Sequence, residues 1–145
     1  MDGRTLLIHK KRGFGKGKIL APGGKVEPDE SLEVAASRET MEEVGISVNK
    51  LKKCGYMEFF FGQEKMPDWI VHVFRSNDFS GTAIETEEAK PFWASVDRMP
   101  YDEMWEDCKI WMPLIFKDKL FHGKFLFDKD VKNMLDYEIT EGSVV

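Results

Sequence analysis

Apolar and polar residues alternate in short runs along most of this chain, and in two longer stretches they recur at helical spacing instead. Alternation at every second residue indicates strands, whereas apolar residues three and four positions apart indicate an amphipathic helix. The runs that predict strands cover residues 4–10, 19–22, 46–62, 69–75, 90–96 and, as the last strand, 124–127. The helical stretches cover residues 29–44, with Gly45 as the stop, and 105–118. Strands interleaved with two helices predict an α/β or α+β sandwich.

The length and composition predict one domain. The chain has 145 residues, without repeats, low-complexity tracts or linkers, and we expect a single domain over residues 1–145. Its apolar runs fall well short of the ~20 residues of a membrane span, and no leader-like segment precedes the first predicted strand. Cys54 and Cys108 are too few for a disulfide framework. These features predict a cytoplasmic protein without a membrane partner.

The charge of the chain is unevenly distributed. It carries 21 Lys and Arg against 26 Asp and Glu, a net charge of −5, so the basic field of a nucleic-acid-coating protein is not expected. Residues 9–18 form a basic, glycine-rich loop, whereas residues 27–43 contain seven carboxylates. A basic segment close to an acidic helix suits a substrate that arrives as phosphate complexed with metal cations, and we expect no stable nucleic-acid partner.

The acidic residues of the first helix share one face. Leu32, Ala36, Glu39 and Glu43 fall in a narrow stripe at helical spacing, with Glu42 alongside. Carboxylates crowded at the C-terminal end of a helix repel one another and the helix dipole. Hard divalent ions with oxygen ligands, Mg²⁺ above all where phosphates complete the shell, would relieve that repulsion. A solvated acidic helix face explains the same three carboxylates equally well.

The surrounding spacing favours the metal interpretation. Gly24, Glu30, Arg38-Glu39, Glu42-Glu43 and Gly45 match the fixed positions of the Nudix box, G-x5-E-x7-R-E-U-x-E-E-x-G-U, with Thr40 in place of the first large aliphatic residue. The chain resembles a Nudix hydrolase. Further segments are similar to the MutT-type branch of oxidised purine nucleoside triphosphate hydrolases, namely residues 10–15, 71–74, 104–105, 121–125 and 135–137. The resemblance covers residues 4–140 and implies a Nudix αβα sandwich with a mixed β-sheet between helices.

The resemblance also implies a metal site and a reaction. Mg²⁺, with Mn²⁺ as an alternative, would be held by the Gly23 carbonyl and by Glu39, Glu42, Glu43 and Glu88, with Glu87 a rival to Glu88. Water would attack a nucleoside triphosphate to release nucleoside monophosphate and pyrophosphate, with metal ions neutralising the phosphates. Glu43 is the expected base and Glu39 the alternative. Arg38 belongs to the catalytic cluster, and its pair with Glu30 is expected to brace the helix.

The substrate-binding residues implied by the resemblance are spread along the chain. They are Lys10, Phe14, Leu20, Gly24, Lys25, Phe59, Phe61, Trp105, Asp107 and Cys108. Two of them depart from the family pattern, because Leu20 replaces a purine-reading asparagine and Cys108 replaces the second of two adjacent aspartates. A site that reads base edges through hydrogen bonds loses selectivity when such partners are lost. We therefore expect this chain to keep the hydrolysis reaction of the Nudix family more fully than selectivity for 8-oxoguanine.

Three functions follow as alternatives. The first is hydrolysis of oxidised purine nucleoside triphosphates such as 8-oxo-dGTP, as part of nucleotide-pool sanitation. The second keeps the chemistry but changes the substrate to other nucleoside triphosphates or nucleoside diphosphate derivatives. The third is a non-catalytic nucleotide- or RNA-binding module, which the apparent absence of the family's first strand before residues 4–10 suggests. The sequence leaves monomer and homodimer equally open.

Overall fold

The structure of the chain, a computed structural model, describes residues 3–143 and divides into two compact units. The first unit comprises Met1–Leu51 and Ser76–Trp105, and the second comprises Lys52–Arg75 and Glu106–Val145. Across the described residues, no helix is long and apolar enough to cross a membrane. Each unit has its own β-structure and its own α-helix, so each is described separately below.

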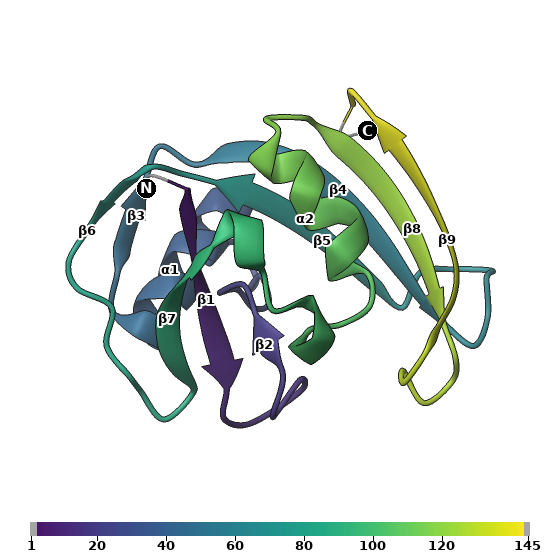
Figure 1. The fold of residues 1–145 in the computed structure, drawn as a ribbon, viewed down its shortest axis with the longest axis horizontal. Helices are drawn as coiled ribbons and strands as arrows, with labels where there is room; N and C mark the ends of the chain where they lie inside the picture. The colour runs from purple at the N-terminus through teal and green to yellow at the C-terminus, as the bar shows by residue number, and fades with distance from the viewer. Residues whose placement is uncertain (1–2, 144–145) are drawn as a thin grey trace. The chain divides into compact units, whose positions relative to one another are not determined.

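The first unit holds two small antiparallel sheets and one helix (Figure 1). Its elements are β1 (Arg4–Lys10), β2 (Ile19–Leu20), α1 (Leu32–Val44), β3 (Ser47–Asn49), β6 (Asp78–Ser80), β7 (Ala89–Ser95) and the 3₁₀ helices η1 (Val96–Arg98) and η2 (Tyr101–Glu103). Strand β1 lies between β2 and β7, and β3 pairs with β6. A buried cluster of Ile8, Val44, Ile46 and Ala89 joins β1, the end of α1 and β7. This packing fixes the C-terminal end of α1 inside the unit.

Both ends of α1 are capped. The Ser31 hydroxyl accepts a hydrogen bond from the Val34 N–H at 3.1 Å. At the other end Gly45 adopts a left-handed φ of 74° and donates its N–H to the Met41 carbonyl. The helix begins three residues later than the pattern predicts, because Asp29 has a φ of 64° and cannot be helical. The predicted stop at Gly45 is confirmed.

The second unit is built on a four-stranded mixed sheet. Its elements are β4 (Lys52–Phe61), β5 (Trp69–Arg75), α2 (Cys108–Phe116), β8 (Phe121–Phe127) and β9 (Met134–Glu141). The strand order is β5-β4-β8-β9, with β4 and β8 parallel and the other neighbours antiparallel. Alternate residues of β8 are buried, namely Phe121, Gly123, Phe125 and Phe127. Trp111 of α2 stacks on Phe121 at 5.8 Å between ring centroids, which places the helix on this face (Figure 1).

The mixed α+β class predicted from the sequence is confirmed, and most predicted elements are present. The predicted strand over residues 46–62 is two strands, because Lys50 adopts a φ of 49° between β3 and β4. The second helix is shorter than predicted, since Asp118 leaves the helical region with a φ of 58°. Within residues 3–143 no strand precedes β1, which has β2 and β7 as its neighbours.

The prediction that residues 124–127 form the last strand is wrong, because β9 follows and pairs with β8. Its residues Leu135, Tyr137 and Ile139 do alternate with polar ones, as a strand pattern requires, although this edge strand leaves most of its residues exposed. The segment between the predicted strands 69–75 and 90–96 also contains β6, which is only three residues long.

Phe125 should carry a large share of the second unit's stability. It is fully buried and stacks between Phe59 and Tyr137. We expect Phe125→Ala to lower the free energy of unfolding by about 3–5 kcal/mol in urea denaturation, because it removes buried area and leaves a cavity. Leu135→Ala, at a residue 61% exposed in β9, is the control and should change it by less than about 0.5 kcal/mol. Equal effects of the two substitutions would contradict this description of the core.

Candidate active site

The last two turns of α1 carry the three carboxylates of the predicted metal set. Glu43 is buried, with 2% exposure, Glu39 is half-buried and Glu42 is exposed. The shared helix face that the spacing predicts therefore leads from water into the core of the first unit. Removing an ionised carboxylate from water is costly unless it gains partners, so the surroundings of Glu43 are informative.

Glu43 has a partner for each of its oxygens. Oε1 accepts from the Gly23 N–H at 2.9 Å, and Oε2 accepts from the Lys10 ammonium at 3.0 Å. Burial nevertheless raises the pKa of Glu43 above its usual value, although the Gly23 and Lys10 contacts oppose the rise and Glu39 adds to it. Glu43 thus binds a proton more readily than an exposed glutamate does, although its Oε2 lies beside the Lys10 ammonium.

Gly24 leaves room for the second carboxylate. A Cβ atom at Gly24 would lie 2.2 Å from the Glu39 Cδ, whereas one at Gly23 would meet no heavy atom within 4 Å. Side-chain atoms cannot approach that closely, so the Glu39 carboxylate can lie against the backbone only because residue 24 has no side chain. The turn after β2 and the helix α1 are in this way fitted to each other.

Arg38 ties the acidic residues of α1 together. Its Nε and Nη2 atoms donate to the two oxygens of Glu30 at 2.6 and 3.0 Å, so the ion pair predicted from the sequence is present. Its Nη1 atom donates to Glu39 at 3.0 Å and to Glu42 at 3.2 Å. The Arg38 hydrogen bonds lower the pKa of Glu30. The guanidinium also donates to the Lys25 carbonyl at 2.9 Å, which attaches the turn to the helix.

A fourth carboxylate approaches from the segment before β7. The Arg12 guanidinium donates to Glu88, and the Lys10 ammonium lies 3.8 Å from the Glu88 Oε2. The Arg12 contact lowers the pKa of Glu88. Lys10 therefore contacts Glu43 and Glu88 together, whereas the side chain of Glu87 is 88% exposed. Of the two rivals in the sequence, Glu88 is the one that lies beside Glu43.

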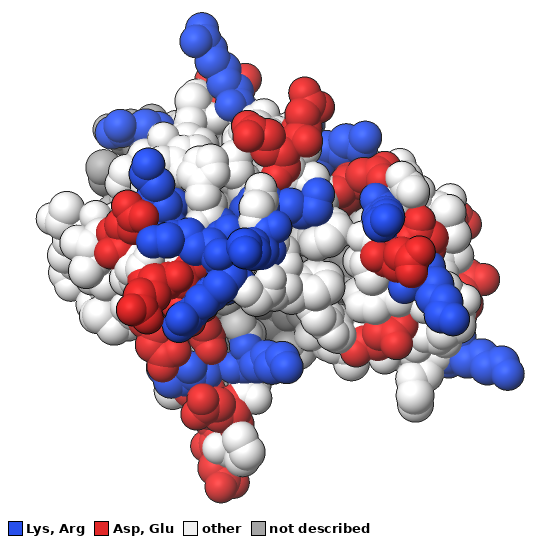
Figure 2. All heavy atoms as spheres, turned by 90° about the horizontal axis from the view of Figure 1, so that it is seen from below, with Lys and Arg blue, Asp and Glu red and all other residues white. Residues whose placement is uncertain are grey.

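These residues form a set of oxygen donors interleaved with basic side chains. Within residues 3–143, no three of the acidic, histidine and cysteine side chains converge on one point as metal ligands, because Lys10, Arg12 and Arg38 pair with the carboxylates. Figure 2 shows the same mixture on the surface, with basic side chains directly beside acidic ones. The donor set suits a hard cation such as Mg²⁺, and the Lys10 ammonium shows that a positive charge fits between Glu43 and Glu88.

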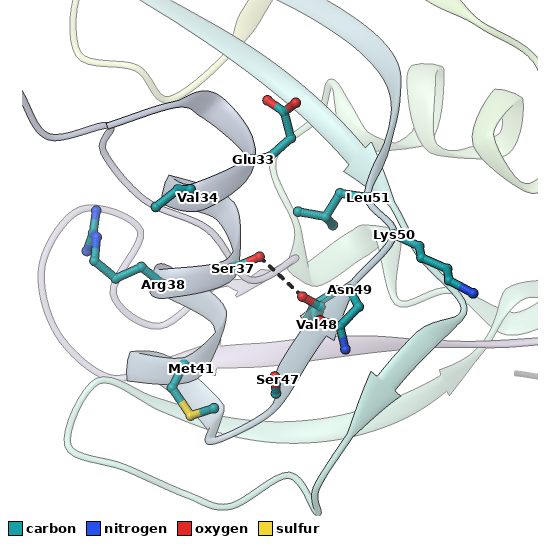
Figure 3. A pocket seen from close by; sticks show the side chains of 10 residues that line it. All are labelled: Glu33, Val34, Ser37, Arg38, Met41, Ser47, Val48, Asn49, Lys50 and Leu51. Atoms are coloured by element: carbon teal, nitrogen blue, oxygen red, sulfur yellow. Dashed lines mark hydrogen bonds between the residues drawn. The ribbon is translucent and has the colours of Figure 1, made fainter. Parts of the chain in front are cut away.

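A separate cavity of about 460 Å³ lies between α1 and β3 (Figure 3). Its lining includes Val34 and Met41 of the helix and Val48 of the strand, and the Ser37 hydroxyl donates to the Val48 carbonyl at 3.3 Å. Arg38 lines this cavity and also pairs with Glu39 and Glu42. The carboxylate cluster, made up of Glu39, Glu42, Glu43 and Glu88, does not line it. The cavity is therefore distinct from the carboxylate cluster.

Known proteins resemble this chain in sequence and in structure. The sequence profile of the NUDIX domain matches residues 1–115. The chain belongs to the Nudix family. An oxidized purine nucleoside triphosphate hydrolase of Danio rerio is 43% identical over 138 residues, covering 92% of this chain and 87% of that protein. The protein of the same name in Mus musculus is 41% identical and covers 95% and 87%.

The structural comparison agrees. The crystal structure of a MutT protein from Bacillus halodurans matches with a TM-score of 0.81 at 28% sequence identity, covering 94% of this chain and 90% of that chain. Together with the sequence relatives, this shows that the chain is a Nudix pyrophosphohydrolase. Thr40 is its one departure within the Nudix box, and its hydroxyl donates to the Ala36 carbonyl at 2.8 Å, so the polar group is satisfied inside the helix.

Part of the base-binding set predicted for this Nudix chain lies in the first unit. The Phe14 ring stacks on Trp105 at 5.4 Å between centroids, and Phe14 is 48% exposed. Lys18 places its ammonium 4.5 Å from the centre of the Trp105 ring, a contact that sequence reasoning missed. Leu20 packs against the core cluster of the unit. The Phe14 ring and the Lys18 ammonium thus both lie against the Trp105 ring, and stacking of these rings on a base stays a prediction.

The rest of that set lies in the second unit. Phe59 stacks on Phe125, and Phe61 meets Trp69 edge to face at 5.7 Å, so both rings take part in the aromatic packing of the sheet. Asp107 and Cys108 are buried at the start of α2. The Trp111 Nε1–H donates to Asp107 at 2.8 Å, yet burial raises the pKa of Asp107 to about 6. The contact of these four predicted residues, Phe59, Phe61, Asp107 and Cys108, with a nucleotide base stays a prediction.

The buried Asp107 should make stability depend on pH. Its folded pKa of about 6 lies above the usual value of 3.8, so the stability it contributes is complete below pH 3.8 and is lost as the pH rises through 6. Asp107→Asn keeps an acceptor for Trp111 without the charge. Relative to the wild type, we expect its free energy of unfolding to rise by about 2–3 kcal/mol between pH 4 and pH 7.5 in urea denaturation.

The matched control is Asp102→Asn, at an exposed residue of η2. It should leave the pH dependence of unfolding as it is in the wild type. A difference between Asp107→Asn and the wild type that does not change with pH would contradict the raised pKa.

Proposed function

We propose that this chain hydrolyses oxidised purine nucleoside triphosphates in a Mg²⁺-dependent reaction, releasing nucleoside monophosphate and pyrophosphate. Residues 1–145 act in this proposal as one Nudix domain that clears damaged nucleotides from the cytosolic pool. The observation that carries it is the buried Glu43 carboxylate, held between the Gly23 N–H and Lys10 at the end of α1. The relatives from Danio rerio and Mus musculus, named for this activity, support the choice of substrate.

The proposed cation ligands are all oxygen atoms. Mg²⁺, or Mn²⁺ in its place, would be held by the Gly23 carbonyl and the carboxylates of Glu39, Glu42, Glu43 and Glu88. The bound cation supplies neutralisation of the negative charge that develops on the phosphates. Its binding would exchange contacts that these carboxylates now make with Lys10 and Arg38.

Glu43 is the proposed base. The oxygen of a water molecule forms a bond to phosphorus, the phosphoanhydride bond breaks, and Glu43 accepts the proton that the water loses. A pKa raised by burial suits this role, because a base works best when its pKa is close to the working pH. Glu39 is the alternative base. Lys10 then places a positive charge beside the phosphates, and Arg38 keeps Glu39 and Glu42 in position.

A second substrate class is favoured by one observation. Leu20 stands where the family pattern has a purine-reading asparagine, and its apolar side chain packs against the core of the first unit. Phe14 and Trp105 can stack on any base, because every base has an aromatic face. Hydrolysis of unmodified nucleoside triphosphates or of nucleoside diphosphate derivatives is therefore the second candidate.

The test is product release from 8-oxo-dGTP, 2-oxo-dATP, dGTP, dATP and GTP, each with Mg²⁺ and with EDTA. Mg²⁺-dependent release of pyrophosphate that is faster from the oxidised purines supports the proposal. Mg²⁺-dependent release without that preference supports the second substrate class. Nucleotide binding that persists in EDTA, without turnover of any nucleotide, would contradict the catalytic function and indicate a binding module.

Glu43→Gln tests the assignment of the base. Gln keeps an oxygen that accepts from the Gly23 N–H but cannot take up a proton, so we expect kcat to fall by about 10³-fold. The control is Glu33→Gln, at an exposed residue in the first turn of the same helix, which should leave kcat unchanged. Circular dichroism during heating shows whether both variants are folded. A folded Glu43→Gln variant with wild-type kcat would contradict the role of Glu43.

A further inference from the structure

Thr86 lies in the segment between β6 and β7, two residues before Glu88. It is half-buried, and its hydroxyl donates to the main-chain carbonyl of Glu43 at 2.7 Å. The last carbonyl groups of a helix have no partner within the helix, so this bond satisfies one of them. The neighbouring carbonyl of Val44 accepts from the Ile84 N–H at 2.9 Å. Two hydrogen bonds therefore attach the segment to the end of α1.

The same hydroxyl organises the turn that carries Glu88. Its oxygen accepts from the Glu88 N–H at 3.2 Å and faces the Ala89 N–H at 3.3 Å. The Thr86 N–H in turn donates to the Ala89 carbonyl at 2.9 Å. Ala89 is fully buried in the core cluster, so the turn is anchored on that side. One oxygen atom thus contacts the main chain of Glu43 and of Glu88.

The remaining groups of Glu88 are held as well. Its carbonyl accepts from the Lys11 N–H at 3.0 Å, and its side chain is held by Arg12 and approached by Lys10. The Lys11 ammonium donates to the Thr86 carbonyl at 2.7 Å. Lys10 and Arg12 are basic side chains that a bound cation or phosphate would compete with, whereas the Thr86 hydroxyl contacts only neutral main-chain groups. The Thr86 hydroxyl is therefore the link between the two carboxylate residues that would persist when charges in the site change.

We propose that Thr86 is a positioning residue, whose hydroxyl sets the place of Glu88 relative to Glu43 and thereby the affinity for the divalent cation. This inference rests on the proposed function, since Glu88 is a cation ligand only in that proposal. Groups that orient metal ligands typically change metal affinity when they are removed, even though they do not touch the metal.

The experiment compares Thr86→Val, which keeps the shape and removes the hydroxyl, with Thr86→Ser, which keeps the hydroxyl. Mn²⁺ binding is measured by electron paramagnetic resonance without nucleotide, so the readout does not depend on the substrate. We expect Thr86→Val to raise the Kd for Mn²⁺ roughly tenfold, and Thr86→Ser to restore an affinity within about twofold of the wild type. The matched control is Thr82→Val, at an exposed threonine of the same segment.

Activity gives a second readout. The Mg²⁺ concentration for half-maximal rate should rise by the same factor in Thr86→Val, with kcat at saturating Mg²⁺ within about twofold of the wild type. Thermal unfolding of each variant confirms that it is folded under the assay conditions. Should valine not be tolerated, Thr86→Ala also removes the hydroxyl and gives the same test. Wild-type Mn²⁺ affinity in a folded variant without the hydroxyl would overturn the inference.

Glu88→Gln tests whether Glu88 is a cation ligand, separately from whether Thr86 positions it. If it weakens Mn²⁺ binding and Thr86→Val does not, the inference on Thr86 is wrong and the ligand set stands. If it leaves Mn²⁺ binding unchanged, Glu88 is not a ligand, and the ligand set and the inference both fail. In the double variant, Thr86→Val should add less than twofold to the effect of Glu88→Gln, because residues that act through one another are not additive. Fully additive effects would also overturn the inference.

Discussion

A carboxylate kept out of water at the C-terminal end of a helix is the constraint on which the first unit depends. Glu43 is 2% exposed, and it lies at the end of α1 where the helix dipole is negative. Both conditions disfavour its charge, so the surrounding chain has to supply donors. The Gly23 N–H and the Lys10 ammonium are those donors, and they come from the segment after β2 and from the end of β1. The placement of β1, β2 and α1 around one side chain is explained in this way.

The same constraint connects structure to chemistry. A buried carboxylate that is stabilised by an ammonium group is also one that a divalent cation can stabilise, because both partners are hard positive charges. Glu39 can join it only because Gly24 has no side chain, and Glu88 is brought beside it by the segment before β7. Crowded carboxylates would be unfavourable in an ordinary helix. Here these carboxylates, with a basic residue between them, are the features that a phosphate-hydrolysing site needs.

Local spacing made much of this site predictable. Glu39, Glu42 and Glu43 share one face of α1, so a regular helix brings these carboxylates together without knowledge of the rest of the fold. The Glu30–Arg38 pair followed from the spacing of the Nudix box instead, because Glu30 precedes the helix. The mixed α+β class and the end of α1 at Gly45 followed from patterns of the same kind. The start of α1 did not, since Ser31 caps the helix only after Asp29 has taken a left-handed conformation.

Contacts between distant residues were beyond the sequence. Thr86 bonds to a residue 43 positions earlier in the chain, and a lone threonine in a polar segment gives no sign of it. The contact of Lys18 with the Trp105 ring was missed for the same reason, because the ring comes from a distant segment of the chain. A residue pattern describes what a segment can do by itself, whereas these features depend on which segments meet.

The central claim is that a divalent cation binds at the end of α1 between Glu43 and Glu88. The most direct test is a titration of the ¹⁵N-labelled protein with Mn²⁺, followed by paramagnetic broadening of the amide signals. We expect the signals of Gly23, Gly24, residues 39–44 and residues 86–89 to broaden first, and EDTA to restore them. Broadening centred on the acidic start of α1, at residues 27–33, or no selective broadening at all, would contradict the claim.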